Sequence, residues 1–256
     1  MLNRFWQKTK QFWQELTKLF LFLFKEKPAN LPIVIVPGWA GTAKNYQTLI
    51  SSLQKQTNQK IYFVDYHQAD LINIDILYDF LIKHQLAKVN LIAHSAGAIN
   101  ALTLARYEPQ LFNKIVLVDP AGLIKDNNFS HLIGHGLMYL LNSSKDILAG
   151  RNRIAGLTVI RDLIQYTFDN PIKSLAETKN ISDHQISGFI QPLLQAGIKL
   201  YLIHGERDSL FPVTEITAIA KRNHLTNFYT VPAEHNDIFI APEPYVKIIA
   251  KILNLV

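Results

Sequence analysis

Six short apolar runs, separated by stretches with helical spacing, constrain the fold of this 256-residue chain more than any other feature. Most runs are continuously apolar, which is typical of strands covered by helices on both faces of a sheet. Strand–helix alternation implies a mostly parallel sheet with right-handed crossovers. The expected strands cover residues 33–36, 61–66, 89–93, 115–118, 200–204 and 228–231. The expected helices cover residues 44–56, 71–86, 96–107, 213–223 and 242–254.

One interval breaks this alternation. Residues 121–198 lie between the fourth and fifth expected strands and contain no convincing strand. Apolar residues within 128–142 and 154–168 recur at helical spacing. An interval this long is not a simple loop. The sequence therefore predicts a helical cap, 121–198, inserted into an α/β core made of residues 31–120 and 199–256.

The strongest local signal is a serine between an apolar run and a helical stretch. Ser95 follows the third expected strand, and the residues two before and two after it, Ala93 and Gly97, are small. A sharp strand-to-helix turn needs small residues at both places and exposes the serine hydroxyl as a nucleophile. The N-terminus of the following helix favours negative charge. We expect Ser95 to be catalytic; the alternative is an ordinary serine cap of that helix.

A serine nucleophile needs a base, and the base needs an acid that orients it. Asp208 follows the fifth expected strand, and His235 follows the sixth. The order serine, acid, histidine is the one expected for a serine at such a turn. We predict the triad Ser95, Asp208 and His235, with Asp119, after the fourth strand, as the competing acid.

An oxyanion formed during acyl transfer needs two backbone N–H donors. One should be Ala96, directly after the nucleophile, and the other should come from the loop after the first strand. Glycines in that loop allow its backbone to approach the site. Trp39 is the expected second donor, and Ala40 is the alternative.

These residues together resemble the α/β-hydrolase superfamily, in particular serine esterases and lipases with a helical cap. The resemblance extends over about residues 31–254. It rests on Pro37-Gly38-Trp39, Ala93-His94-Ser95-Ala96-Gly97, Gly205-Glu206-Arg207-Asp208 and His235. Two positions depart from the usual pattern. Ala93 stands where glycine is commoner, and Pro37 stands where a histidine usually opens the oxyanion loop.

The resemblance implies hydrolysis of a small-molecule carboxylic ester through an acyl-enzyme, with no metal and no organic cofactor. An apolar cap favours an apolar acyl or lipid-like substrate. Other reactions of this scaffold stay open, namely C–C bond hydrolysis, acyl transfer and cofactor-free peroxidase chemistry. A non-catalytic binding protein with the same fold is the alternative from another class, and the complete triad order argues against it.

Residues 1–27 differ from the rest of the chain. They contain six basic and two acidic residues, a net +4 of the total +6, together with Trp6 and Trp13. Their helical apolar stripe predicts an amphipathic arm that lies in a membrane interface; packing on the protein's own body or on a twin subunit is the alternative. We expect a cytoplasmic protein that is peripheral on the inner face of the membrane.

The charge of the remaining chain argues against one class of partner. Its net +2 carries no basic stripe, so we expect no nucleic-acid partner. Cysteine is absent, which excludes a disulfide scaffold and cysteine-ligated metal. The sequence leaves the oligomeric state open.

Overall fold

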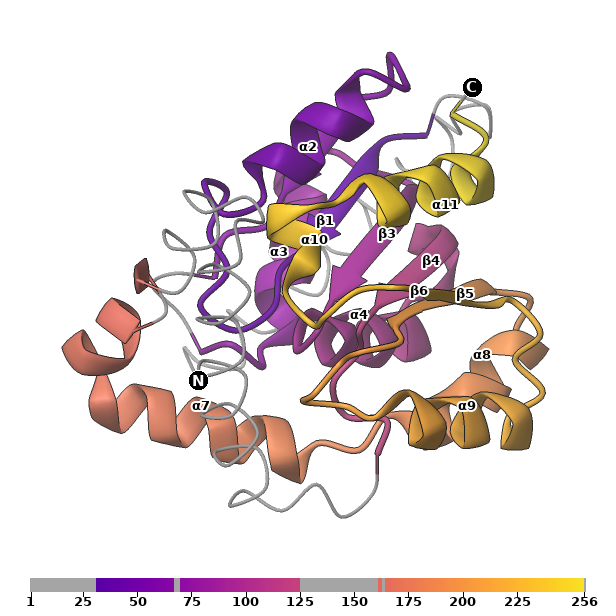
Figure 1. Ribbon diagram of the computed structural model, residues 1–256. Coiled ribbons are helices and arrows are strands. Elements are labelled where there is room, and N and C mark those ends of the chain that lie inside the picture. The colour runs from indigo at the N-terminus through magenta and orange to yellow at the C-terminus, as the bar shows by residue number, and fades with distance from the viewer. Residues whose placement is uncertain (1–30, 67–69, 125–160, 163, 256) are drawn as a thin grey trace, which may run out of the picture.

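The computed structural model describes residues 31–66, 70–124, 161–162 and 164–255 (Figure 1). The amphipathic arm predicted for residues 1–27 lies outside the described residues, as does the part of the predicted cap at 125–160. In the described part of the chain, no helix is long and apolar enough to cross a membrane.

A six-stranded sheet forms the centre of the molecule. All of its neighbouring strands pair in parallel, in the order β2-β1-β3-β4-β5-β6. The strands are β1 (Ile33–Val36), β2 (Ile61–Phe63), β3 (Val89–His94), β4 (Phe112–Val118), β5 (Lys199–Gly205) and β6 (Phe228–Val231). The predicted parallel α/β sheet is therefore confirmed. Strand β2 ends earlier than expected, at Phe63, and β4 begins earlier, at Phe112.

Helices cover both faces of the sheet, which explains why its strands are continuously apolar. One apolar core includes side chains of α3 (Ile74–Lys83), α4 (Gly97–Tyr107), α8 (Ile190–Gln195) and α9 (Val213–Arg222). The other includes side chains of α2 (Gln47–Gln54), α10 (Asp237–Ile240) and α11 (Glu243–Leu253). Figure 1 shows α2 and α11 on the opposite side of the sheet from α4 and α9. The two helical layers fix the sheet, so its strand ends are rigid supports for a site.

The described residues between β4 and β5 contain helices and no strand. Residues 164–169 are helical, and α7 (Pro171–Asp183) and α8 follow. Helix α8 buries Ile190 and Leu193 in the core beside α4 and β5. Helix α7 lies apart from the sheet in Figure 1. The division into core and cap remains a prediction.

The turn from β3 into α4 depends on a missing side chain. A Cβ at Gly97 would lie 2.5 Å from the carbonyl oxygen of Val36 and 2.6 Å from that of Pro37. Both atoms belong to the backbone and cannot move aside without shifting β1. Helix α4 can therefore start directly beside the end of β1 only with glycine at this position.

We predict that Gly97→Ala destabilises the protein. The added methyl collides with backbone, and overpacking of this kind costs about 1–3 kcal/mol. The free energy of unfolding, from urea denaturation, measures the loss. Gly188→Ala is the matched control, because nothing lies within 4 Å of a Cβ at Gly188. An unchanged unfolding free energy in Gly97→Ala would show that the turn does not need glycine.

Candidate active site

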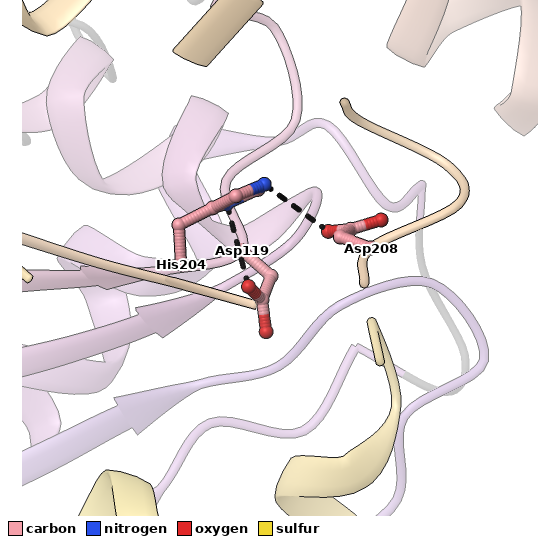
Figure 2. Close-up of side chains that lie close together, drawn as sticks. All are labelled: Asp119, His204 and Asp208. Atoms are coloured by element: carbon pink, nitrogen blue, oxygen red, sulfur yellow. Dashed lines mark ion pairs between the residues drawn. The ribbon is translucent and has the colours of Figure 1, made fainter. Parts of the chain in front are cut away.

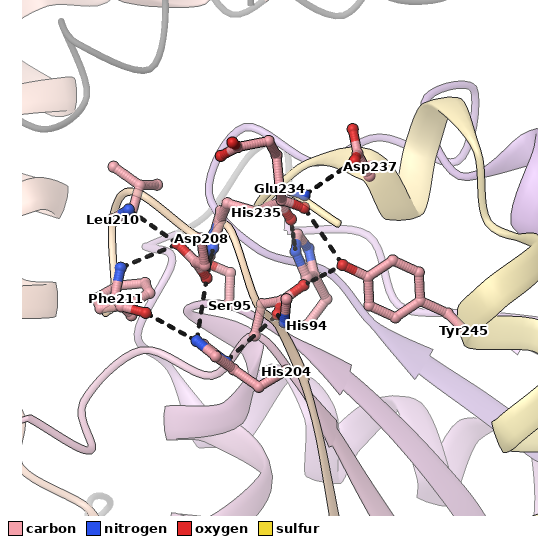
Figure 3. Close-up of polar contacts among 12 residues, drawn as sticks. His94, Ser95, His204, Asp208, Leu210, Phe211, Glu234, His235, Asp237 and Tyr245 are labelled. Atoms are coloured by element: carbon pink, nitrogen blue, oxygen red, sulfur yellow. Dashed lines mark hydrogen bonds and ion pairs between the residues drawn. The ribbon is translucent and has the colours of Figure 1, made fainter. Parts of the chain in front are cut away.

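The fold brings the three predicted triad residues together at the carboxyl ends of the strands. The Ser95 Oγ lies 3.0 Å from His235 Nε2, and His235 Nδ1 lies 2.8 Å from Asp208 Oδ2 (Figure 3). The three side chains come from the turn after β3, the turn after β5 and the loop after β6. All three are buried. Parallel strands end at one edge of a sheet, so residues 140 positions apart in the sequence can meet there.

Backbone amides hold the Asp208 carboxylate in one orientation. Its Oδ1 accepts hydrogen bonds from the N–H of Leu210 at 2.8 Å and of Phe211 at 2.9 Å. This leaves Oδ2 to accept from His235 Nδ1. Because the carboxylate only accepts, Nδ1 carries the proton, and the lone pair of Nε2 faces the Ser95 hydroxyl. This tautomer is the one that can remove the serine proton.

Opposite charges shift both pKa values of this pair. Burial opposes the charge of Asp208, but the charge and the hydrogen bond of His235 outweigh it, so the pKa of Asp208 is lowered. Burial likewise lowers the pKa of His235, yet the charge and hydrogen bond of Asp208 raise it above 6.5 overall. Each group stabilises the charged form of the other, so the imidazolium that forms when His235 takes a proton is stabilised.

The serine occupies a strained backbone conformation. Its φ is 50°, in the left-handed region that side chains other than glycine rarely adopt. The main chain of Ser95 is held by three hydrogen bonds, because its N–H donates to Val118 O at 3.0 Å and its O accepts from the N–H of Ala98 and Ala121. The neighbouring strand end thus holds the hydroxyl at the corner.

The loop after β1 lies against this corner. A Cβ on Gly38 would stand 2.8 Å from Ser95 Cβ, so only glycine allows this approach. Among the described residues, the N–H groups of Trp39, Ala40 and Ala96 have no hydrogen-bond acceptor. These groups are the expected oxyanion donors and their alternative. Both Trp39 and Ala40 are therefore available as the second donor.

A buried hydrogen-bond chain connects the oxyanion loop to the histidine loop. Gly38 N–H donates to Tyr46 Oη at 2.9 Å, Tyr46 Oη lies 2.7 Å from His94 Nδ1, and His94 Nε2 lies 3.2 Å from the carbonyl oxygen of His235. The first group can only donate and the last can only accept, so Tyr46 donates to Nδ1 and Nε2 carries the proton. Burial, and then the charge of His235, lower the pKa of His94 to about 3. His94 is therefore a neutral support beside the serine.

Asp119, the competing acid, is hydrogen-bonded to groups other than His235. Its Oδ1 accepts from Gly205 N–H at 2.7 Å and its Oδ2 from Tyr245 O–H at 2.8 Å. Burial, and then the charge of Asp208, raise the pKa of Asp119. The histidine is hydrogen-bonded to Asp208, so the geometry favours Asp208 as the acid.

Asp119, His204 and Asp208 form a compact buried group whose spacing could hold a metal ion (Figure 2). His204 Nδ1 lies 3.3 Å from Asp119 Oδ1, and His204 Nε2 lies 3.6 Å from Asp208 Oδ2. However, N–H and O–H donors already point at all four carboxylate oxygens, and His204 Nε2 is bonded to Phe211 O at 2.8 Å. Burial lowers the pKa of His204. Because these atoms are already hydrogen-bonded, the group is better suited to a hydrogen-bond network than to binding a metal cation.

Known proteins of similar sequence or structure support the fold described above. No family model matches the chain. An sn-1-specific diacylglycerol lipase, ABHD11 from Xenopus laevis, is 32% identical over 114 residues, which is 40% of this chain and 36% of the lipase. The chain thus matches about a third of that relative's length. Ethanol acetyltransferase 1 from Cyberlindnera fabianii is 23% identical over 88% of this chain and 80% of its own.

Solved structures give the fold over most of the chain. An esterase from Thermogutta terrifontis aligns with a TM-score of 0.64 and 16% identity, covering 88% of this chain and 89% of its own. The 2-hydroxy-6-oxo-6-phenylhexa-2,4-dienoate hydrolase from Rhodococcus sp. strain RHA1 aligns with a TM-score of 0.67 and 14% identity, covering 89% and 92%. The chain has the α/β-hydrolase fold, as the motifs predicted.

We predict that kcat/KM for an ester rises with pH and levels off only above 6.5, since His235 must be neutral to accept the Ser95 proton and its pKa is raised.

Asp208→Asn removes the charge that raises this pKa while burial still lowers it. The midpoint should therefore move to lower pH, and kcat should fall by roughly three to four orders of magnitude. Asp183→Asn, on the exposed side of α7, is the charge-matched control. An unmoved midpoint in Asp208→Asn would contradict the assignment of Asp208 as the acid.

Proposed function

We propose that this protein is a serine hydrolase that cleaves carboxylic esters. The observation that carries the proposal is the continuous hydrogen-bond chain from Ser95 Oγ through His235 to Asp208 Oδ2. Ser95 Oγ attacks the acyl carbon, and its proton passes to His235 Nε2. The oxyanion that forms accepts hydrogen bonds from the N–H of Ala96 and of Trp39.

The imidazolium of His235 then protonates the leaving alcohol oxygen, and the C–O bond breaks to leave an ester between the acyl group and Ser95. Water attacks this acyl-enzyme while His235 takes one of its protons, and the second tetrahedral intermediate collapses to release the acid as His235 returns that proton to Ser95 Oγ. Asp208 holds the imidazole tautomer and stabilises its cation in both halves of the cycle. The residues of the chain supply every proton transfer in this scheme.

We further propose an apolar acyl or lipid-like substrate. The apolar composition of the predicted cap and the similarity to a diacylglycerol lipase over part of the chain support this substrate class. The favourable free energy of burial grows with the apolar area removed from water. A polar substrate has little such area, so an apolar cap would contribute little to its binding.

Acyl transfer to an alcohol is a second candidate reaction. The match to ethanol acetyltransferase 1, which extends over 88% of this chain, favours it. The first half of the cycle is the same, and the alcohol replaces water in deacylation. Adding ethanol to an ester assay distinguishes the two, because a transferase forms an ethyl ester and a hydrolase forms the free acid.

The nucleophile is tested by a fluorophosphonate probe. Wild-type protein should be labelled, and Ser95→Ala should be neither labelled nor active, since the alanine has no hydroxyl. Ser182→Ala, which removes an exposed hydroxyl on α7, should be labelled like the wild type. An acyl-length series of p-nitrophenyl esters should give increasing kcat/KM with chain length. Folded wild-type protein that resists labelling would support a binding protein instead.

Residues 1–27 are proposed to attach the enzyme to a membrane surface. Their deletion should abolish sedimentation with vesicles that contain phosphatidylserine, because it removes both the apolar stripe and the net +4. Hydrolysis of a short soluble ester should be unchanged. Vesicle binding that survives the deletion would contradict membrane attachment, and loss of folding would place the arm in the core.

A further inference from the structure

Helix α7 meets the rest of the protein through a polar face. Its buried residues are Ser174 and Glu177, whereas Ile172 is 83% exposed and Leu175 is 53% exposed. An ordinary surface helix shows the opposite arrangement, with its apolar stripe turned inward. Among the described residues, Ile181 of α7 is partly buried against the apolar core, but the fully buried side chains of the helix are polar, so polar contacts also hold α7 in place.

The Glu177 carboxylate supplies these contacts. Its Oε2 accepts a hydrogen bond from the indole Nε1–H of Trp39 and another from the Tyr166 hydroxyl, both at 2.8 Å. Lys173 Nζ lies 3.8 Å from Oε1. The rings of Trp39 and Tyr166 meet edge to face, with centroids 5.9 Å apart. One buried carboxylate thus joins α7, the helical segment 164–169 and the loop after β1.

Burial of a carboxylate is costly unless hydrogen bonds and a counter-charge compensate for it. Glu177 has both, and an apolar residue of similar size would fill the same space without that cost. What the apolar residue would not supply is a fixed direction, because a carboxylate oxygen holds the indole N–H at one angle and distance. The arrangement therefore specifies where the Trp39 side chain lies.

Trp39 belongs to the segment whose backbone faces the nucleophile. The preceding residue, Gly38, is packed against Ser95, and the following residue, Ala40, has a φ of 53°. A second contact links the loop after β1 to the helical residues 161–162, since Asn45 Nδ2 donates to Asp162 Oδ2 at 3.3 Å. The oxyanion loop is thus held from the nucleophile side by packing and from the other side by Glu177.

We propose that Glu177 is a positioning residue that acts through the Trp39 indole, so that the docking of α7 aligns the backbone N–H groups of the oxyanion loop. The proposal rests on the proposed ester hydrolysis, because it assigns Glu177 a role in stabilising the oxyanion of that reaction. Substrate contact is not required of Glu177. Its effect should fall on the transition state rather than on ground-state binding.

The experiment uses the full chain with Trp6 and Trp13 replaced by phenylalanine, which leaves Trp39 as the single tryptophan. Glu177→Leu and Glu177→Ala each remove the acceptor, and Glu177→Gln keeps an uncharged one. Asp183→Asn is the control, because it removes a carboxylate from the exposed side of the same helix. The readouts are kcat and KM for p-nitrophenyl butyrate, the affinity for butylboronic acid and the Trp39 emission maximum.

The leucine and alanine variants should lose about tenfold or more in kcat with KM nearly unchanged, as expected when an oxyanion donor is misaligned. Affinity for the boronic acid, which forms a tetrahedral adduct on Ser95, should fall in parallel. The Trp39 emission should shift to longer wavelength. Glu177→Gln should recover kcat to within about threefold of the parent, since an amide oxygen still accepts the hydrogen bonds.

Three outcomes overturn the proposal in distinguishable ways. If the parent turns over the ester and the folded leucine or alanine variant matches its kcat, Glu177 has only a structural role. If the parent neither turns over the ester nor reacts with a fluorophosphonate, the proposed hydrolysis itself fails, and the role of Glu177 fails with it. A rise in KM with kcat unchanged would also overturn it, because that pattern indicates lost ground-state binding.

Discussion

The hydrogen bond from His235 Nδ1 to Asp208 Oδ2 is the interaction on which the site depends. A carboxylate can only accept, so this bond fixes the histidine tautomer and leaves the lone pair of Nε2 facing Ser95. The bond is fixed in turn by the amides of Leu210 and Phe211, which hold the other carboxylate oxygen. The two loops that carry the pair follow β5 and β6, neighbouring parallel strands, so the sheet sets the distance between them.

Around this pair lies a second group of buried polar residues that the proposed chemistry does not use directly. Tyr46 and His94 connect the oxyanion loop to the backbone of His235. Asp119 and Tyr245 connect the end of β4 to the start of the acid turn, because Asp119 accepts hydrogen bonds from both Gly205 and Tyr245. Such networks are costly when incomplete and rigid when complete. We interpret them as the means by which loops from four strands keep one geometry.

The sequence predicted the parts of this structure that have a local signature. The strands, the turn at Ser95 and the order of Ser95, Asp208 and His235 follow from apolar runs, small residues and strand ends, and the structure brings the three side chains together. Tyr46 and Glu177 have no such signature. Each is a polar residue in or near a helix, and its role depends on a partner far away in the sequence. Glu177 and Trp39, for example, are 138 residues apart. Helix α10 spans four residues, too few to show helical periodicity.

The proposed mechanism requires that an acyl group be transferred to Ser95 and then released. Rapid-quench mass spectrometry during turnover of a slowly deacylating ester tests it directly. We expect that the intact protein gains the mass of the acyl group, that the modified peptide contains Ser95, and that the adduct forms at the rate of alcohol release. Ester turnover without an adduct, or an adduct on another residue, would contradict it.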